Sequence, residues 1–259
     1  MAGRIAAMRQ MSLFALPQIP MVRPGDDIAG LIRQALDAAG LALSSGDILV
    51  IAQKIISKAE GRCVRLADIS PTPRAVELAA QVDKDSRLVE LILRDSREVV
   101  RSRPGVLIVE HELGYIHANA GIDRSNVDGG EDSVLLLPLD SDASAETLRT
   151  ELSSSGEHEI GIIINDSAGR AWREGAIGFA LGTAGIEPLV DLVGKRDLMG
   201  RPMEVTSVAV ADELAAAASV LMGQADEGLP VVHVRGFPYP LREGDFNELP
   251  RDEKSDFFR

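Results

Sequence analysis

Aromatic residues are scarce in this sequence of 259 residues, at 3% of all positions. The core must therefore consist of Val, Ile, Leu and Ala, and the aromatic stacking platforms that bind single-stranded nucleic acid are not expected. The net charge of −13 points the same way, because it would repel a phosphate backbone or an anionic membrane surface. We predict no nucleic-acid and no membrane partner. Metal ions and local Lys or Arg can still admit a nucleotide.

Cysteine and histidine are also rare. Cys63 is the single cysteine, which excludes an intrachain disulfide and fits the reducing cytoplasm where we expect the protein. The four histidines show no zinc-site spacing, so each is expected to be a strand or surface residue rather than a ligand: His111, His117, His158 and His233. An oxygen-bound ion such as Mg²⁺ or Mn²⁺ suits this composition better than zinc.

Long apolar runs are missing as well, since none approaches the ~20 residues that a membrane helix needs. Residues 1–10 are predicted to be a flexible tail, and the charged, Phe-containing residues 241–259 a C-terminal tail. Between them, residues 11–240 show no clean linker. We therefore expect one domain of two interwoven lobes.

The pattern of apolar residues predicts strands and helices in irregular alternation. Helices are expected from Asp26 or Asp27, over 71–83, over 86–94, after a cap at Ser144, and over 211–222. Strands are expected at 12–19, 48–52, 106–109, 115–119, 133–139, 159–164, 177–181, 204–208 and 230–234. Hairpins mixed with helices favour an α+β class with mixed or antiparallel sheets and flanking helices.

Two aspartates follow apolar, strand-like runs and stand beside small polar residues. Asp123 lies in the polar stretch Asn119–Asn126, after the run 106–109. Asp166 follows the run 162–164, with one polar residue between them. A strand end that holds a metal ion or a phosphate needs such groups, whereas an apolar wall does not. We predict a shared divalent-ion site.

The common nucleotide-binding motifs are absent. Gly194-Lys195 lacks the rest of a P-loop, and the glycines from 178 to 185 do not have the dinucleotide-binding spacing. Several segments could replace them. Leu16–Ile19 could form a stiff wall or simply an edge strand, and Lys58 could reach a phosphate or pair with a nearby acid. Arg170 and Arg173 could grip a phosphoryl or carboxylate group, or form ordinary surface ion pairs.

Taken together, these segments resemble the coenzyme F420-0:L-glutamate ligases in order and spacing, from about residue 13 to about 240. The marks are Leu-Pro-x-Ile, Ile-Ser-Lys-x-Glu-Gly, Val-Ala-Asp-Glu and Val-Arg-Gly, with two more specific segments, Asn119–Val127 and Asp166–Gly175. The resemblance implies a homodimeric enzyme that uses GTP, a divalent cation and K⁺. It would add L-glutamate to the lactyl carboxylate of a deazaflavin acceptor, F420-0, through an acyl phosphate, releasing GDP and phosphate. Further γ-linked glutamates could follow.

The resemblance also implies roles for single residues. Asp123 and Asp166 would hold one divalent ion, and Ser167 and Gln224 a second. The contacts to GTP would be Leu16, Pro17, Gln18, Ile19, Gln53, Lys54, Lys58, Asn126, Met222, Gly223, Gln224, Ala225, Asp226, Glu227, Gly228 and Leu229. We add Arg170 and Arg173 as clamps on phosphate or substrate at the catalytic centre.

Three departures from the pattern of that family involve four residues. Gln53-Lys54 replaces a pair of small hydroxyl residues, Asn165 replaces a Thr, and Gln224 stands where an acidic residue is common. Two alternatives therefore stay open beside the ligase. One is a glutamate ligase for a different acid, and the other is a GTP- or metal-binding module without ligase activity.

Overall fold

A five-stranded mixed sheet forms the centre of the molecule. The computed structural model describes residues 8–127, 130–153 and 158–258. The central sheet has the strand order β1-β12-β2-β8-β9. Its strands are β1 (Ser12–Ala15), β2 (Ile48–Ala52), β8 (Gly161–Arg170), β9 (Arg173–Ala184) and β12 (Val231–Arg235). Only β2 and β8 pair in parallel, and the other neighbours are antiparallel.

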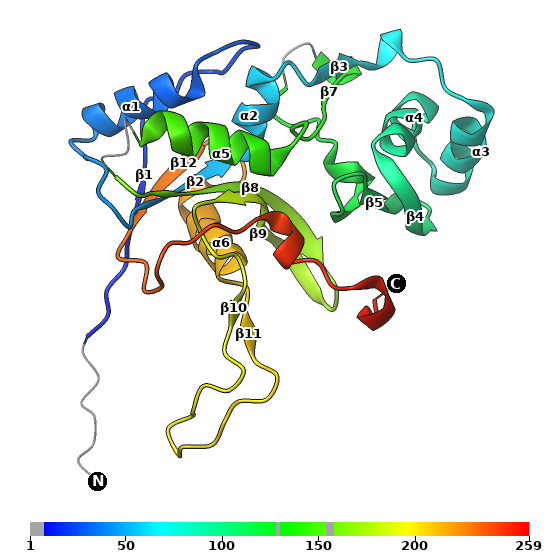
Figure 1. Ribbon diagram of the computed structural model, residues 1–259. Coiled ribbons are helices and arrows are strands. Elements are labelled where there is room, and N and C mark those ends of the chain that lie inside the picture. Colours follow the sequence, from blue (N-terminus) through cyan, green and yellow to red (C-terminus); the bar gives the residue numbers. More distant parts are fainter. Residues whose placement is uncertain (1–7, 128–129, 154–157, 259) are drawn as a thin grey trace.

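Helices cover both faces of this sheet (Figure 1). One face packs against α1 (Ile28–Ala38), α2 (Gln53–Ala59) and α5 (Ser141–Leu152), in a core of Ile, Leu and Val side chains. The other face packs against α6 (Val210–Met222). Strand β2 is buried almost throughout, because it lies between two strands and two helical layers. This arrangement fixes the ends of β2 and β8 rigidly.

A smaller lobe is inserted between α2 and α5, and Figure 1 shows it beside the sheet. It has its own apolar clusters. Its elements are β3 (Cys63–Arg65), α3 (Pro73–Val82), α4 (Ser86–Arg94), β4 (Ser96–Arg103), β5 (Val106–His111), β6 (Ile116–Ala118) and β7 (Ser133–Leu135). The two segments that connect this lobe to the central sheet are hydrogen-bonded to each other, since Leu136 N donates to Arg62 O at 3.2 Å.

The remaining elements are short. The two-stranded arm β10 (Val190–Asp191) and β11 (Ser207–Val208) projects from the body (Figure 1). Five 3₁₀ turns complete the described chain: η1 (Leu66–Asp68), η2 (Asn119–Gly121), η3 (Gly130–Asp132), η4 (Phe246–Glu248) and η5 (Glu253–Ser255). No helix of the described ranges combines the length and the apolar character needed to cross a membrane.

The predicted α+β class with mixed and antiparallel sheets is confirmed. The predicted cap Asp27 is also confirmed, because its side chain accepts from Gly30 N at 2.8 Å. The cap at Ser144 is wrong. Asp140 caps α5 by accepting from Ala143 N at 3.0 Å, and Ser144 lies within the helix. Both residues carry a capping oxygen, so the choice depended on where the tertiary fold ends the preceding loop.

Other boundaries moved. The first strand ends at Ala15 rather than at residue 19, and β8 continues beyond Ile164 to Arg170. The predicted N-terminal tail lies mostly outside the described residues. In the region predicted as a C-terminal tail, Phe246 is buried, and its ring lies 4.4 Å from that of Tyr115.

Candidate functional site

A cavity of about 400 Å³ opens where β2 ends beside the middle of β8, between the sheet, the inserted lobe and the end of α6. Because β2 and β8 are parallel, Ala52 at the end of β2 pairs with Asn165 of β8. The residues that follow this pair, Gln53 and Asp166, are thereby placed at the cavity. The polar side chains at its wall include Lys54, Lys58, Asp123, Ser125, Asn126, Asn165, Asp166, Ser167, Gln224, Asp226 and Glu227.

Asp123 reaches the cavity from the inserted lobe through an unusual turn. Asn119, Ala120 and Gly121 have φ values of +55°, +54° and +70°, so three successive residues are left-handed. Such backbone is rare outside glycine and is held only where the surroundings determine it. A Cβ at Gly121 would lie 2.6 Å from Leu137, which leaves space only for glycine. The turn then joins β7, because Asp123 and Leu135 exchange backbone hydrogen bonds of 2.8 and 3.0 Å.

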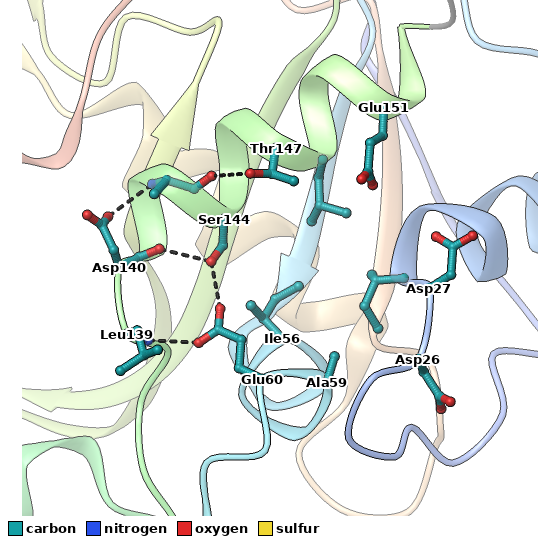
Figure 2. Close-up of a pocket in the computed structure, with 13 residues that line it drawn as sticks. Asp26, Asp27, Ile56, Ala59, Glu60, Leu139, Asp140, Ser144, Thr147 and Glu151 are labelled. Atoms are coloured by element: carbon teal, nitrogen blue, oxygen red, sulfur yellow. Dashed lines mark hydrogen bonds between the residues drawn. The ribbon is translucent and has the colours of Figure 1, made fainter.

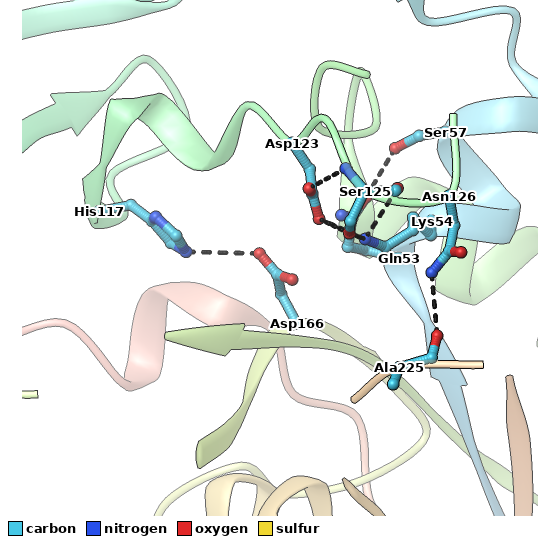
Figure 3. A network of polar contacts seen from close by, with 9 residues as sticks. All are labelled: Gln53, Lys54, Ser57, His117, Asp123, Ser125, Asn126, Asp166 and Ala225. Carbon is cyan, nitrogen blue, oxygen red and sulfur yellow. Dashed lines mark hydrogen bonds and ion pairs between the residues drawn. The ribbon is translucent and has the colours of Figure 1, made fainter. Parts of the chain in front are cut away.

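An ammonium group holds the Asp123 carboxylate. Lys54 Nζ forms an ion pair with Asp123 Oδ2 and donates to Ser125 Oγ at 2.7 Å (Figure 3). Ser125 N also donates to Asp123 Oδ1 at 2.7 Å. Burial alone would raise the pKa of Asp123, but the bonds from Lys54 and Ser125 outweigh it and hold the pKa below its usual value. Asp123 is therefore an ionised, positioned carboxylate.

The second carboxylate, Asp166, faces a histidine instead. His117 Nε2 lies 3.4 Å from Asp166 Oδ2, and both side chains are largely buried (Figure 3). The other ring nitrogen of His117 lies 2.8 Å from Ala118 O, and the ring packs on Phe179. Burial would lower the pKa of His117, but the Asp166 carboxylate raises it above the ordinary value.

Sequence reasoning missed this role of His117. The residue lies in β6 as predicted, so the strand interpretation is confirmed, but its side chain also contacts a candidate metal ligand. His111, on the neighbouring strand β5, differs. Burial lowers its pKa to about 4, and its Nδ1 accepts from Leu113 N at 3.0 Å. No spacing in the sequence distinguishes these two histidines, because β6 meets β8 only through the tertiary fold.

The loop after α6 closes the cavity from a third side. Asn126 Nδ2 donates to Ala225 O at 3.2 Å and thereby links the inserted lobe to this loop. Below it, Asn165 Nδ2 donates to Ser219 Oγ at 3.2 Å, and Gly178 leaves space for both side chains. The Asn165 Oδ1 atom is buried and has no hydrogen-bond partner in the part of the chain that the structure describes.

The donor set fits a hard divalent cation such as Mg²⁺ or Mn²⁺. Carboxylate, hydroxyl and carboxamide oxygens of Asp123, Asp166, Ser167 and Gln224 line one cavity. Within residues 8–127, 130–153 and 158–258, no group of three His, Cys, Asp or Glu side chains lies close enough to hold an ion alone. An ion here would therefore need further oxygen ligands from water or from a substrate phosphate, as is usual for Mg²⁺.

Most predicted contacts gather at this cavity. Those that line it are Ile19, Gln53, Lys54, Lys58, Asp123, Asn126, Asp166, Ser167, Met222, Gly223, Gln224, Ala225, Asp226, Glu227, Gly228 and Leu229. Leu16 lies in the core with 0% exposure, and Pro17 and Gln18 are outside the cavity lining. Arg170 and Arg173 also lie outside it. They face each other across the exposed turn that joins β8 to β9.

A second cavity, of about 540 Å³, lies between α1, α2 and α5 (Figure 2). Its lining holds five carboxylates and no Lys or Arg: Asp26, Asp27, Glu60, Asp140 and Glu151. A nucleotide would be repelled there. Glu60 is used structurally, since it accepts from Leu139 N at 2.8 Å and from Ser144 Oγ at 2.7 Å. The cavity with Lys54 and Lys58 is therefore the better anion site.

Comparison with known proteins identifies the family of this chain. A model of the family described as F420-0:Gamma-glutamyl ligase matches residues 17–236. The coenzyme F420:L-glutamate ligase of Methanothermobacter thermautotrophicus is 48% identical over 96% of this chain and 99% of its own length. The proteins of the same name from Archaeoglobus fulgidus and Methanocaldococcus jannaschii are 41% and 39% identical, over 96% and 98% of this chain and 97% and 99% of theirs.

Proposed function

Because this chain belongs to the F420-0:gamma-glutamyl ligase family, we propose that it joins L-glutamate to the carboxylate of coenzyme F420-0 at the expense of GTP. The single observation that carries the proposal is the cavity at the end of β2, beside the middle of β8. There, two carboxylates from different lobes meet Lys54 and Lys58. Anionic oxygens for a cation and ammonium groups for phosphate are the groups that phosphoryl transfer requires.

The chemistry explains why such a cavity is needed. A carboxylate is a poor acylating agent, so its oxygen first takes the γ-phosphoryl group of GTP, and GDP leaves. The amino group of glutamate then attacks the carbonyl carbon of the acyl phosphate, the C–O bond to phosphate breaks, and the amine loses a proton. A divalent ion bound at this cavity would neutralise phosphate charge during the transfer. We include a requirement for K⁺ and the addition of further γ-linked glutamates in the proposal.

Each cavity residue has a defined task in this proposal. Asp123 and Asp166 would hold one divalent ion, and Ser167 and Gln224 a second. Lys54 and Lys58 present ammonium groups to phosphate oxygens, and Asn126 keeps the 222–229 loop against the nucleotide. His117 positions Asp166 from behind. Catalysis is then mainly the alignment of substrates and the neutralisation of their charge.

The proposed homodimer has a candidate surface in the β10–β11 arm. Four large apolar side chains on the arm are exposed, Leu198 and Val205 almost completely: Val193, Leu198, Met199 and Val205. A second copy of the chain could bury them. Light scattering measures the mass of the assembly in solution and thereby tests for the dimer. We also place the protein in the cytoplasm, on the single cysteine and the substrates of the proposed reaction.

Mass spectrometry tests the reaction. The protein is incubated with F420-0, L-glutamate, GTP and Mg²⁺ or Mn²⁺, with and without K⁺. Products heavier by glutamyl units, with GDP released in equal amount, support the ligase.

The uncharged Gln224 favours the second candidate, a binding module, because it removes a carboxylate from the second ion site. GTP binding without any product would establish that alternative. A glutamylated product from another acid, with F420-0 unchanged, would establish a ligase for a different acceptor.

A further inference from the structure

The single tryptophan of this aromatic-poor chain is exposed to solvent. Trp172 lies in the turn between β8 and β9, and 88% of its surface is accessible. Its φ of +67° is left-handed, a conformation that turns usually give to Gly or Asn. Neither the core nor the backbone conformation of the turn accounts for an indole at this position.

A second aromatic ring stands beside it. The ring of Phe258 lies 6.2 Å from the ring of Trp172, tilted by 53°. The guanidinium group of Arg251 lies 5.5 Å above the Phe258 ring, which fixes that ring through a cation–π contact. Phe258 approaches from the C-terminal segment, which Figure 1 shows near the far end of the β8–β9 hairpin. The two rings thus form a small aromatic corner in which the indole stays largely exposed to solvent.

The hairpin connects this corner to the proposed reaction centre. Asp166 and Trp172 belong to the same run of chain, with Asp166 in the middle of β8 and Trp172 just after its end. At about 3.3 Å per residue, the strand carries Trp172 roughly 20 Å from Asp166. The acceptor in the proposed reaction has its reactive lactyl carboxylate at one end and its planar deazaflavin ring at the other. An acceptor that reacts beside Asp166 must place its ring at a distance from it.

We propose that the exposed indole of Trp172, backed by Phe258, binds the planar ring of the acceptor. This rests on the proposed function for the identity of the ligand. The required chemistry is a flat heteroaromatic ring with an anionic arm. Stacking on an aromatic side chain needs only a flat ring and is strong, as the stacking of nucleic-acid bases on aromatic side chains shows. Arg170 and Arg173, on either side of the turn, provide positive charge for the arm.

The test measures binding of F420-0 to the full-length chain without GTP, metal or glutamate, by the anisotropy of deazaflavin fluorescence. Trp172→Ala is expected to weaken binding about tenfold or more, and Trp172→Phe to restore most of it. Phe258→Ala should have a smaller effect. Phe257→Ala is the matched control, because Phe257 is 94% exposed and makes no ring contact with Trp172 within the described residues. A deazaflavin that lacks the lactyl phosphate arm should show the same dependence on Trp172.

Unchanged affinity in Trp172→Ala overturns the inference, and so does a wild-type chain that does not bind F420-0. A change in oligomeric state without a change in affinity also overturns it, since Trp172 would then be an interface residue. The proposed function fails separately. A chain that binds F420-0 through Trp172 but yields no glutamylated product keeps this site and loses the ligase. If the chain forms glutamylated product and Trp172→Ala leaves the affinity for F420-0 unchanged, the ligase stands and this binding site is refuted.

Discussion

The two carboxylates of the cavity have contrasting surroundings. Asp123 comes from the inserted lobe and meets the ammonium group of Lys54. Asp166 comes from the central sheet and meets an imidazole, His117, whose charge depends on pH. One carboxylate thus faces a lysine and the other an imidazole, the side chain that ordinarily titrates near neutral pH. The two aspartates of this cavity therefore have different neighbouring groups.

The largest effect is expected from neutralising either carboxylate. Asp123→Asn and Asp166→Asn each keep the side-chain shape but remove a charge from the proposed ion site. Turnover should fall by a hundredfold or more, on the order of what a bound metal ion contributes. Release of GDP and formation of the glutamylated product measure it, with circular dichroism to verify folding. Full activity in either variant would refute the metal assignment.

The next effect concerns the ammonium group of Lys54. Lys54→Met should raise the pKa of Asp123, because burial then acts without the ammonium group that opposes it. A carboxyl ¹³C NMR titration measures the shift, and turnover should fall about tenfold. Lys58→Met is the matched control, since Lys58 lines the same cavity but is no cause of the Asp123 shift. An Asp123 pKa that is equal in both variants would show that Ser125 alone sets it.

The titratable side is tested through its histidine. Asp166→Asn should lower the pKa of His117, because burial then dominates, while His111 should still titrate at about 4. Proton NMR of the few histidine rings measures both. The folded pKa of His117 is raised, so its contribution to stability is complete below the unfolded value of about 6.5. That contribution is lost as the pH rises through the folded pKa. An unmoved His117 would mean that the 3.4 Å contact carries no charge interaction.

The smallest effect is expected at Asn126, which links the inserted lobe to the loop after α6. Asn126→Gly and Asn126→Ala both lose the 3.2 Å bond to Ala225 O, so the KM for GTP should rise about two- to tenfold in each. Asn126 has a φ of +55°, which Gly accepts and Ala resists. The Ala variant should therefore unfold at a lower temperature than the Gly variant. Equal GTP kinetics in wild type and both variants would remove Asn126 from the nucleotide contacts.

The sequence predicted much of this arrangement. The apolar run at 48–52 marked β2, and the Asp27 and Asn119–Asn126 patterns marked a helix start and a polar loop that the structure confirms. Helix α2 was missed because it begins at Gln53, directly after β2, with no turn and no side-chain cap to mark its start. Arg170 and Arg173 were expected at the reaction centre because β8 was predicted to end near residue 164. The longer strand carries them out to the turn.

The contacts of Lys54 and His117 were beyond sequence reasoning. Lys54 and Asp123 are 69 positions apart, and His117 meets Asp166 across two different sheets. Neither pair has a local pattern, since each depends on how the inserted lobe sits against the central sheet. The resemblance to a family directed attention to these loops, but the partners of each side chain required the tertiary structure.

The parallel pairing of β2 with β8 also has a kinetic consequence. Ile48 pairs with Gly161, so the whole inserted lobe and α5 lie within the loop that this pairing closes. Loop closure costs entropy that grows with the logarithm of loop length, and contacts of such high sequence separation slow folding. The lobe, with its own apolar clusters, can gain structure before the strands meet. Since Asp123 and Asp166 come together only when this loop closes, we expect the reaction centre to form after the inserted lobe.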